Sequence, residues 1–475
     1  MNGFKEIMEK IYTKKIISII IVLQPIIDIL TFFMKEYANM DVTVGVVIRT
    51  LFLLYALIYI IFSEKITKNK KNLLSLIVLS IVFLINILIT ALNKTFVISD
   101  VKNIMKVCYL PIILIFFLMY NEKSKEKLSY KILIINGLII SSSILIAKLT
   151  GSEVCTYGDS INCIEGYSGW FYSANELGVI LVLLFGVTLY DFYKTNYSVL
   201  SLISLIMILY STLCLGTKAS FIGVVGILCL NLIFQIVRLI FFRSKGQAVM
   251  LVMSLFIPLF IYLLIPSIPV CYNNYDLFRS YNIYCKVPID KSKFNQKDFD
   301  YKNEQKHMEG EYSKENISND KKTELILNGR DKYLEQKVEK VKKRSLLEKL
   351  FGMGYSGYGK NNDGKIVITE RDYYDMVFEY GYIGTLAILT PLILAFMSIA
   401  LFMFNNLKSI LHNKNIMIFA VLIVLAGAHI SGHTLFAPAV TTYIAYMIGI
   451  FSELVLVVKD RIVSHNAKLD LSNPS

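Results

Sequence analysis

The chain has 475 residues, of which 55% are hydrophobic and 18% are charged, and its formal net charge is +13. A soluble protein of this length would not place apolar runs of about twenty residues one after another, because its helices need polar faces. The composition therefore excludes an ordinary soluble helical protein. The positive charge does not indicate nucleic-acid binding, since most Lys and Arg residues outside one long polar stretch lie in short connections between apolar runs.

The apolar runs predict the fold class and the domain organisation. They fall roughly at 15–34, 43–63, 73–92, 101–120, 132–150, 173–190, 198–215, 220–241, 247–268, 376–404, 415–433 and 438–458. We predict an all-α integral membrane protein with about 12 transmembrane helices and a large loop between spans 9 and 10. The predicted divisions are spans 1–9 in residues 1–266, the loop in 267–373, spans 10–12 in 374–460 and a tail in 461–475.

The basic residues predict the orientation. With the N-terminus inside, the cytoplasmic connections contain the clusters EKITKNKK at 64–71 and NEKSKEKLSYK at 121–131, whereas the short connections on the other side contain few lysines. Because Lys and Arg accumulate in cytoplasmic loops, we expect a multi-pass protein of the cell membrane with both termini in the cytoplasm. The 267–373 loop would then lie outside, and its stretch at 322–351 predicts one or two amphipathic helices near the membrane surface.

The seven cysteines show no spacing that is typical of a zinc site. Cys155 and Cys163 lie in one segment that we place outside, and Cys271 and Cys285 lie in another. Disulfides persist on that side of a membrane, so two local disulfides are one interpretation. Free, partly buried thiols are the other.

Ionisable residues inside predicted spans are costly, and they usually face a partner or an interior cavity. Asp28 in the first span and Arg49 in the second are expected to form a buried pair that holds two helices together, or to line a cavity. His429 and His433 lie at the outer end of the eleventh predicted span. They line a cavity in one interpretation and have a structural role in the other.

Lys218 lies in the very short connection CLGTKASFIG between two spans. Such a lysine is held at the outer membrane surface, beside a helix start whose free N–H groups attract anions. It is either a phosphate contact or a solvated residue of the turn.

Three features follow one another at the end of the long loop. NGR contains Arg330, LFGMGYSGYGK at 350–360 is a Gly-rich turn with two tyrosines, and ITERDYYDMVFEYGYIGTL leads into a span. An arginine fork suits the capture of phosphate, and a carboxylate beside it suits the removal of a hydroxyl proton. The ionisable residues before and at the start of this span are Glu370, Arg371, Asp372 and Asp375.

The chain resembles the O-antigen ligase and polymerase superfamily of bacterial membrane proteins, from GYSGWFYSANELG at 166–178 to GHTLFAPAV at 432–440. The first of these stretches is similar to the family's entry to a span. GTKAS stands where the family has an arginine-containing turn, so Lys218 replaces that arginine, and NGR resembles the second arginine motif. FGMGY followed by EYGYIG resembles the most recognisable signature of the family.

This resemblance implies a glycosyltransferase of the GT-C kind that uses a saccharide on an undecaprenyl pyrophosphate carrier, inverts the anomeric carbon, and needs no metal, nucleotide sugar or other cofactor. By position, Lys218 and Arg330 would bind the pyrophosphate, and Glu370 stands where ligases have a histidine. The ERDYYD form is closer to members described as exopolysaccharide polymerases. The residues that the resemblance makes candidates are Glu370 and Asp372 as catalytic acids, Lys218, Arg330 and Arg371 for the pyrophosphate, and Asn175, Tyr355 and His433 for other substrate contacts.

Several interpretations stay open at this point. Glu370 or Asp372 would deprotonate the acceptor hydroxyl, or Arg371 would form an ion pair with an acid and take no part in catalysis. The function would be polymerisation of repeat units of a cell-surface polysaccharide of the capsule, exopolysaccharide, O-antigen or teichuronic-acid type. The alternatives are a ligase with another acceptor, a lipid-linked oligosaccharide flippase or transporter, and a sensor or scaffold. The expected partners are the undecaprenyl-pyrophosphate-linked glycan and membrane lipid, with a flippase and a chain-length regulator as further candidates and no nucleic acid.

Overall fold

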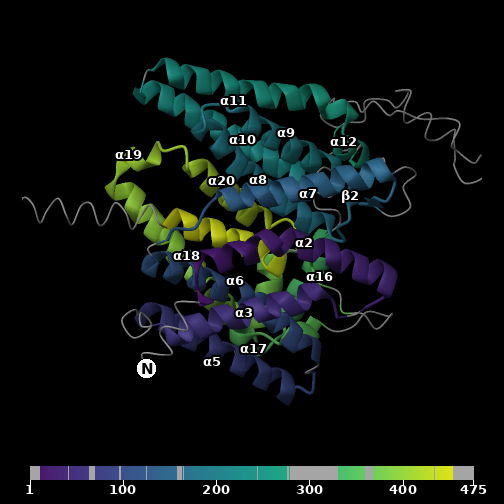
Figure 1. Ribbon diagram of the computed structural model, residues 1–475. Coiled ribbons are helices and arrows are strands. Elements are labelled where there is room, and N and C mark those ends of the chain that lie inside the picture. The colour runs from purple at the N-terminus through teal and green to yellow at the C-terminus, as the bar shows by residue number, and fades with distance from the viewer. Residues whose placement is uncertain are drawn as a thin grey trace, which may run out of the picture.

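The structure is a computed structural model that describes residues 11–40, 42–63, 70–95, 98–124, 126–157, 163, 165–242, 244–274, 278, 330–358, 366, 368–432 and 434–452. Figure 1 shows these residues as a bundle of helices, with α12, β2 and α16 at one end and α19 at the other. The end that contains α12, β2 and α16 is therefore built from parts of the chain that are far apart in the sequence.

The first part of the chain alternates long helices with short connections. Its helices are α2 (Lys14–Ala38), α3 (Val44–Phe62), α5 (Lys70–Leu92), α6 (Ile98–Lys123), α7 (Lys131–Thr150), α8 (Ala174–Lys194), α9 (Val199–Cys214), α10 (Lys218–Phe242) and α11 (Lys245–Leu264). Two short strands, β1 (Val154–Cys155) and β2 (Tyr167–Gly169), pair antiparallel between α7 and α8.

The second part contains shorter elements before its long helix. These are η2 (Ile265–Ser267), α12 (Pro269–Asn273), α16 (Arg330–Lys342), α17 (Leu346–Phe351), η4 (Tyr355–Tyr358), α18 (Asp372–Asn405), α19 (Leu407–Ile410) and α20 (Asn415–Gly427). An apolar helix follows at Pro438–Ser452. The helices α16 and α17 lie in the stretch at 322–351 for which the sequence predicts one or two amphipathic helices.

Nine helices in the described part of the chain are long and apolar enough to cross a membrane. They coincide with the predicted spans 1–6 and 8–10, and three shorter apolar helices, Val199–Cys214, Asn415–Gly427 and Pro438–Ser452, lie at the other three predicted positions. The prediction of an all-α multi-pass membrane protein is thus confirmed. The number of twelve spans stays a prediction, because these three helices are shorter than the roughly twenty residues that a full span needs.

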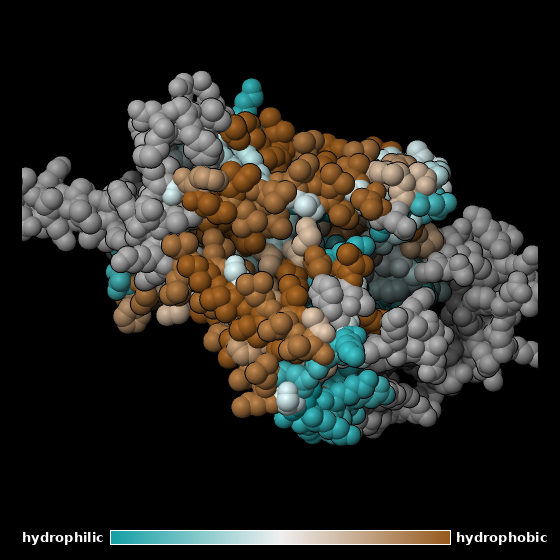
Figure 2. All heavy atoms as spheres, turned by 90° about the horizontal axis from the view of Figure 1, so that it is seen from below, coloured by the Kyte–Doolittle hydropathy of each residue, from teal (hydrophilic) through white to brown (hydrophobic). Residues whose placement is uncertain are grey.

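The bundle has a central helix and a broad apolar surface. Nearly every residue of α8 is buried among α7, α9, α10 and α20, whereas α11 contacts little besides α10 and η2 and exposes large apolar side chains such as Phe256 and Leu263. Figure 2 views the molecule from below and shows the apolar surface as one wide face. An exposed apolar surface of this extent is what a lipid-facing protein requires.

Several helices begin at a serine whose hydroxyl caps the first turn. Ser173, Ser198 and Ser244 accept hydrogen bonds from backbone N–H groups at the starts of α8, α9 and α11. Ser345 and Glu348 form a reciprocal capping box at the start of α17. These caps satisfy donors that would otherwise lack a partner at the helix start.

Two glycines of the signature allow α17 and α18 to cross with their backbones in contact. Gly352 ends α17 with φ of 78°, and Gly381 has φ of 69° at a kink inside α18. A Cβ atom on Gly352 would lie 2.0 Å from the carbonyl oxygen of Glu379, and one on Gly381 would lie 2.4 Å from the carbonyl of Leu350. The amide of Asn86 on α5 donates to the carbonyls on both sides of this crossing.

We expect Gly352→Ala and Gly381→Ala each to lower the melting temperature of the purified protein in detergent. A side chain at either position would occupy the left-handed region of backbone conformation, which costs about 1–3 kcal/mol, and would also clash with the crossing backbone. Gly427→Ala is the control, since nothing lies within 4 Å of a Cβ atom there. Melting of both test variants at the wild-type temperature would show that the close crossing is not required.

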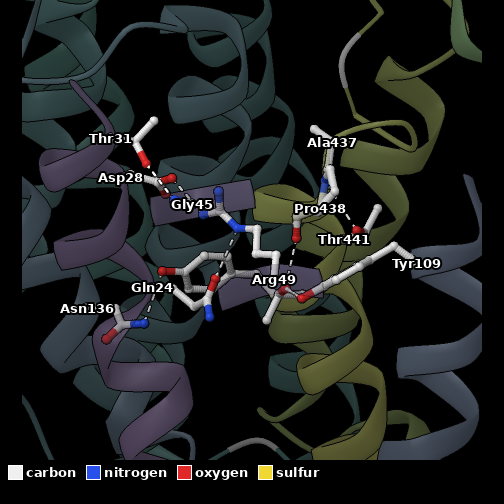
Figure 3. Close-up of polar contacts among 12 residues, drawn as sticks. Gln24, Asp28, Thr31, Gly45, Arg49, Tyr109, Asn136, Ala437, Pro438 and Thr441 are labelled. Carbon is white, nitrogen blue, oxygen red and sulfur yellow. Dashed lines mark hydrogen bonds and ion pairs between the residues drawn. The ribbon is translucent and has the colours of Figure 1, made fainter. Parts of the chain in front are cut away.

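Arg49 and Asp28 form an ion pair between α3 and α2 (Figure 3). The Nη2 atom of Arg49 lies 2.6 Å from Oδ1 of Asp28, and its Nε atom donates to Gln24 at 3.3 Å. The side chains are only 13% and 22% exposed, respectively. The structure thus shows Asp28 and Arg49 as a pair that joins two helices, one of the two roles that the sequence left open. Figure 3 shows Asn136 and Tyr109, from neighbouring helices, around this pair.

Removal of one partner of this pair leaves a poorly solvated charge. Asp28→Asn is expected to destabilise the protein by about 3 kcal/mol, because Arg49 then loses its nearest counter-charge in a low-dielectric region. The double variant Asp28→Asn/Arg49→Met should recover part of this loss. Equilibrium unfolding in mixed detergent tests both variants, and a double variant as unstable as Asp28→Asn would contradict the explanation.

Candidate active site

Arg330 and Glu370 meet at the end of the bundle where α16 joins the body. Arg330 is the first residue of α16, and Glu370 lies two residues before α18. The Nη2 and Nε atoms of Arg330 donate to Oε2 of Glu370 at 2.8 Å and 3.2 Å. The Arg330 side chain is 16% exposed and the Glu370 side chain is 47% exposed, so the carboxylate is accessible from outside. An arginine and an acid that the sequence singles out in separate motifs thus form one charged pair.

The backbone at Glu370 is held in an uncommon conformation. Its φ of 54° lies in the left-handed region, which a non-glycine residue adopts rarely. Asp375 accepts hydrogen bonds from the backbone N–H groups of Thr369 and Arg371, on either side of Glu370, at 3.0 Å and 3.2 Å. Gly432 packs closely on Glu370: a Cβ atom on Gly432 would lie 2.9 Å from the Cα atom of Glu370. Strain of this kind is concentrated at functional positions.

The two residues after Glu370 are buried and contact the backbone of the segment at 429–435. Asp372 is 2% exposed, and its Oδ2 atom accepts from the backbone N–H groups of Thr434 and Leu435 at 2.8 Å and 2.6 Å. Arg371 is 6% exposed, donates from Nε to the carbonyl of His429 at 3.0 Å, and stacks over the ring of Tyr374. Of these three neighbouring candidates, Glu370 is the accessible one.

Lys218 is partly buried, and the positive charge of Arg330 acts on it. It is the first residue of α10 and follows Gly216, whose φ of 69° belongs to the tight turn after α9. Gly178 of α8 packs against Thr217 in this turn. A Cβ atom on Gly216 would clash with the backbone of Glu165, and one on Gly178 would press on the side chains of Thr217 and Ser220, so both glycines allow the close packing that fixes where α10 begins. Two of the predicted pyrophosphate residues, Lys218 and Arg330, therefore lie in the same region of the molecule.

The helix that carries Arg330 is fastened to the Gly-rich turn. Lys337 of α16 donates from Nζ to the carbonyl of Tyr358 at 3.1 Å and lies 4.5 Å from the centre of its ring. The hydroxyl of Tyr358 donates in turn to Asp375, which fixes the backbone around Glu370. Burial raises the pKa of Tyr358 well above its usual value, so this phenol keeps its proton. Tyr355, one of the predicted substrate contacts, lies half-buried beside Tyr358 with ring centres 6.4 Å apart.

The remaining predicted residues are placed less fully. Asn175 is half-buried in the first turn of α8, whereas His433 lies outside the described residues. Among the residues that the structure describes, no group of three or more His, Cys, Asp or Glu side chains is arranged to hold a metal ion.

The structure also brings Tyr157 to this place, which the sequence analysis did not single out. Its phenol interacts electrostatically with Arg330 and with the side chain of Asn273. Tyr157 follows Cys155, which forms a disulfide with Cys163. The disulfide interpretation is thus confirmed for this pair. Cys271 is also disulfide-bonded, while Cys285 lies outside the described residues.

The fold and the site define a multi-pass membrane protein that gathers two cationic side chains and an accessible carboxylate at one end of its bundle. The O-antigen ligase like membrane protein family matches residues 10–459, nearly the whole chain. The chain therefore belongs to this family, as the motifs indicate. It is a membrane protein of polysaccharide biosynthesis and a glycan-processing enzyme of the glycosyltransferase type, with a lipid-linked glycan as substrate. No curated protein matches the chain.

The Lys337 contact predicts a pH dependence of stability. Burial lowers the pKa of Lys337 from 10.5 to about 8. Between these pH values the Lys337 amine is neutral in the folded protein but protonated in the unfolded chain. The unfolded state then binds more protons, and stability rises with pH across this window. We expect the melting temperature of the wild type to rise relative to that of Lys337→Met as the pH increases from about 8 to 10.5. Parallel pH profiles of the two proteins would contradict this.

Proposed function

We propose that this protein is an extracytoplasmic glycosyltransferase that polymerises repeat units of a cell-surface polysaccharide from an undecaprenyl-pyrophosphate-linked donor. One observation carries the proposal: Arg330 pairs with an accessible acid, Glu370, in a region where its positive charge also acts on Lys218. The two cations suit the departing pyrophosphate, and the carboxylate suits the acceptor hydroxyl.

Arg330 and Lys218 bind the pyrophosphate of the donor in this proposal. The guanidinium has five N–H groups in a planar fork, and the contacts with Glu370 use two of them. The other N–H groups remain for phosphate oxygens. Lys218 adds a point charge from a helix start. Arg371 is assigned a supporting role, because its guanidinium already contacts the His429 carbonyl and the Tyr374 ring.

Glu370 acts as the general base. Its carboxylate takes the proton of the acceptor hydroxyl while the hydroxyl oxygen attacks the anomeric carbon from the side opposite the pyrophosphate. The bond between the anomeric carbon and the phosphate oxygen breaks, its electron pair leaves with the pyrophosphate, and the configuration inverts. Positive charge from Arg330 and Lys218 stabilises this leaving group in the transition state. Asp372 positions Glu370 by tying the start of α18 to the segment at 434–435.

An apolar pocket on α18 gives the carrier lipid a place beside this site. The pocket has a volume of about 430 Å³ and is open to the surface. Its lining combines Tyr373, in the first turn of α18 three residues after Glu370, with side chains from Leu389 to Ala400 on the later part of the same helix. An aliphatic chain in this pocket would leave its pyrophosphate near the charged end of α18.

The proposal places α16, α17 and the site on the extracytoplasmic side, with both termini in the cytoplasm. The clusters of basic residues in the opposite connections support this orientation. The disulfide between Cys155 and Cys163 supports it independently, because disulfides form and persist outside the cytoplasm.

Substitution of the charged pair tests the proposal in cells. We expect Arg330→Ala and Glu370→Gln each to lower the polymerisation rate by about 10²–10⁴-fold, since each removes a group that acts in the transition state. Lipid-linked single repeat units should then accumulate. The matched controls are Lys342→Ala and Glu339→Gln, which disrupt an exposed ion pair on the same helix α16. Wild-type chain lengths in both test variants would refute the proposal.

A second experiment separates the candidate activities. Purified protein in liposomes receives labelled, carrier-linked glycan, and the products are separated by size. New glycosidic bonds between repeat units support a polymerase, and transfer only to a different added acceptor supports a ligase. Translocation of unchanged donor across the bilayer would indicate a flippase and would contradict a glycosyltransferase.

A further inference from the structure

The segment between α7 and α8 is closed by a disulfide and takes no part in the function proposed above. Cys155 is bonded to Cys163, eight residues further along the chain. β1 and β2 pair across the base of this segment, and the N–H of Thr156 donates to the carbonyl of Gly166 at 2.9 Å. The disulfide and the strand pair thus fix the position of residues 154–157 relative to the end of α7.

This segment packs directly on the turn that leads to Lys218. A Cβ atom on Gly216 would lie 1.9 Å from the carbonyl oxygen of Glu165. One on Gly166 would lie 2.3 Å from the carbonyl oxygen of Leu215. The two backbones are in contact without intervening side chains. A displacement of one segment therefore requires a displacement of the other.

Tyr157 lies in this closed segment, on the side that packs near the charged site. Thr156 is hydrogen-bonded to Gly166, which packs on Leu215 in the turn before Lys218, so the next residue, Tyr157, lies at this turn. The side chain of Asn273 acts on the phenol of Tyr157 and donates to the carbonyl of Gly216 at 3.0 Å. The positive charge of Arg330 acts on the same phenol. Asn273 lies two residues after the disulfide-bonded Cys271, and Tyr157 lies two residues after Cys155. Each of the two residues is thus close in sequence to a disulfide. Burial raises the pKa of Tyr157, and the hydroxyl keeps a proton that it can donate.

We propose that Tyr157 is a further binding residue of the anionic donor site, where it donates a hydrogen bond to a phosphate oxygen, and that the Cys155–Cys163 disulfide positions it there. This inference rests on the proposed function, because it takes the pyrophosphate of a lipid carrier as the ligand beside Arg330. A phenol is a neutral donor, so it adds a directed hydrogen bond to a site whose charge comes from Arg330 and Lys218. The disulfide limits the movement of Tyr157 before the ligand arrives, which lowers the entropic cost of binding.

The test measures the affinity of the purified full-length protein in detergent for undecaprenyl pyrophosphate that carries no sugar. We expect Tyr157→Phe to weaken binding about tenfold, the effect of losing one hydrogen bond to a charged group. The apo protein should keep its melting temperature, a combination that a merely structural tyrosine would not give. Tyr210→Phe is the matched control, since it removes a hydroxyl that bonds to Tyr167.

The double variant Cys155→Ser/Cys163→Ser tests the positioning role. It should weaken binding by a similar factor, and adding Tyr157→Phe to it should cause little further loss, because the contact is already lost. Cys229→Ser, which changes an exposed free cysteine, controls for loss of a thiol. Wild-type affinity in the double variant would overturn the role of the disulfide.

The outcomes distinguish this inference from the proposed function. Binding that is lost in Arg330→Ala but unchanged in Tyr157→Phe overturns the assignment of Tyr157 and leaves the proposed function standing. Absence of binding by the wild-type protein, or binding that does not depend on Arg330, overturns the donor site and the Tyr157 assignment with it.

Discussion

The ion pair between Arg330 and Glu370 joins two parts of the chain that are 40 residues apart in the sequence. It ties the first turn of α16 to the residues that precede α18, at the end of the bundle where α10 also begins. The surrounding contacts hold this pair in place. Lys337 and Tyr358 hold α16, while Asp375 fixes the backbone around Glu370. The glycines of the signature allow the close crossing of α17 and α18, so this motif shapes the support of the site more than its chemistry.

The pair also suggests how donor binding and proton transfer would be coupled in the proposed mechanism. Without substrate, Glu370 neutralises part of the charge of Arg330, and the exposure of its carboxylate keeps the pair from being strongly stabilised. A pyrophosphate carries more negative charge than one carboxylate, and it would compete for the same guanidinium. Its binding would release Glu370 to act on the acceptor. The base would then become available only when a donor is present.

Much of the fold follows from the sequence, because long apolar runs in a membrane can form little other than helices. The sequence also singles out Gly352 and Gly381, Arg330 and Glu370, since their motifs resemble those of the family. It does not reveal which acid near α18 is accessible. Asp372 is buried because it binds backbone groups 62 and 63 residues further along the chain, and such contacts leave no local pattern. Tyr157 is missed for the same reason: only the packing of its segment on the Lys218 turn brings it to Arg330.

The most direct measurement is a structure of the protein with bound undecaprenyl pyrophosphate, determined in a lipid nanodisc by electron cryomicroscopy. The account predicts phosphate oxygens within hydrogen-bonding distance of Arg330 and Lys218, with the carboxylate of Glu370 separated from the guanidinium and facing open space. A pyrophosphate bound elsewhere, with the pair between Arg330 and Glu370 intact, would contradict it.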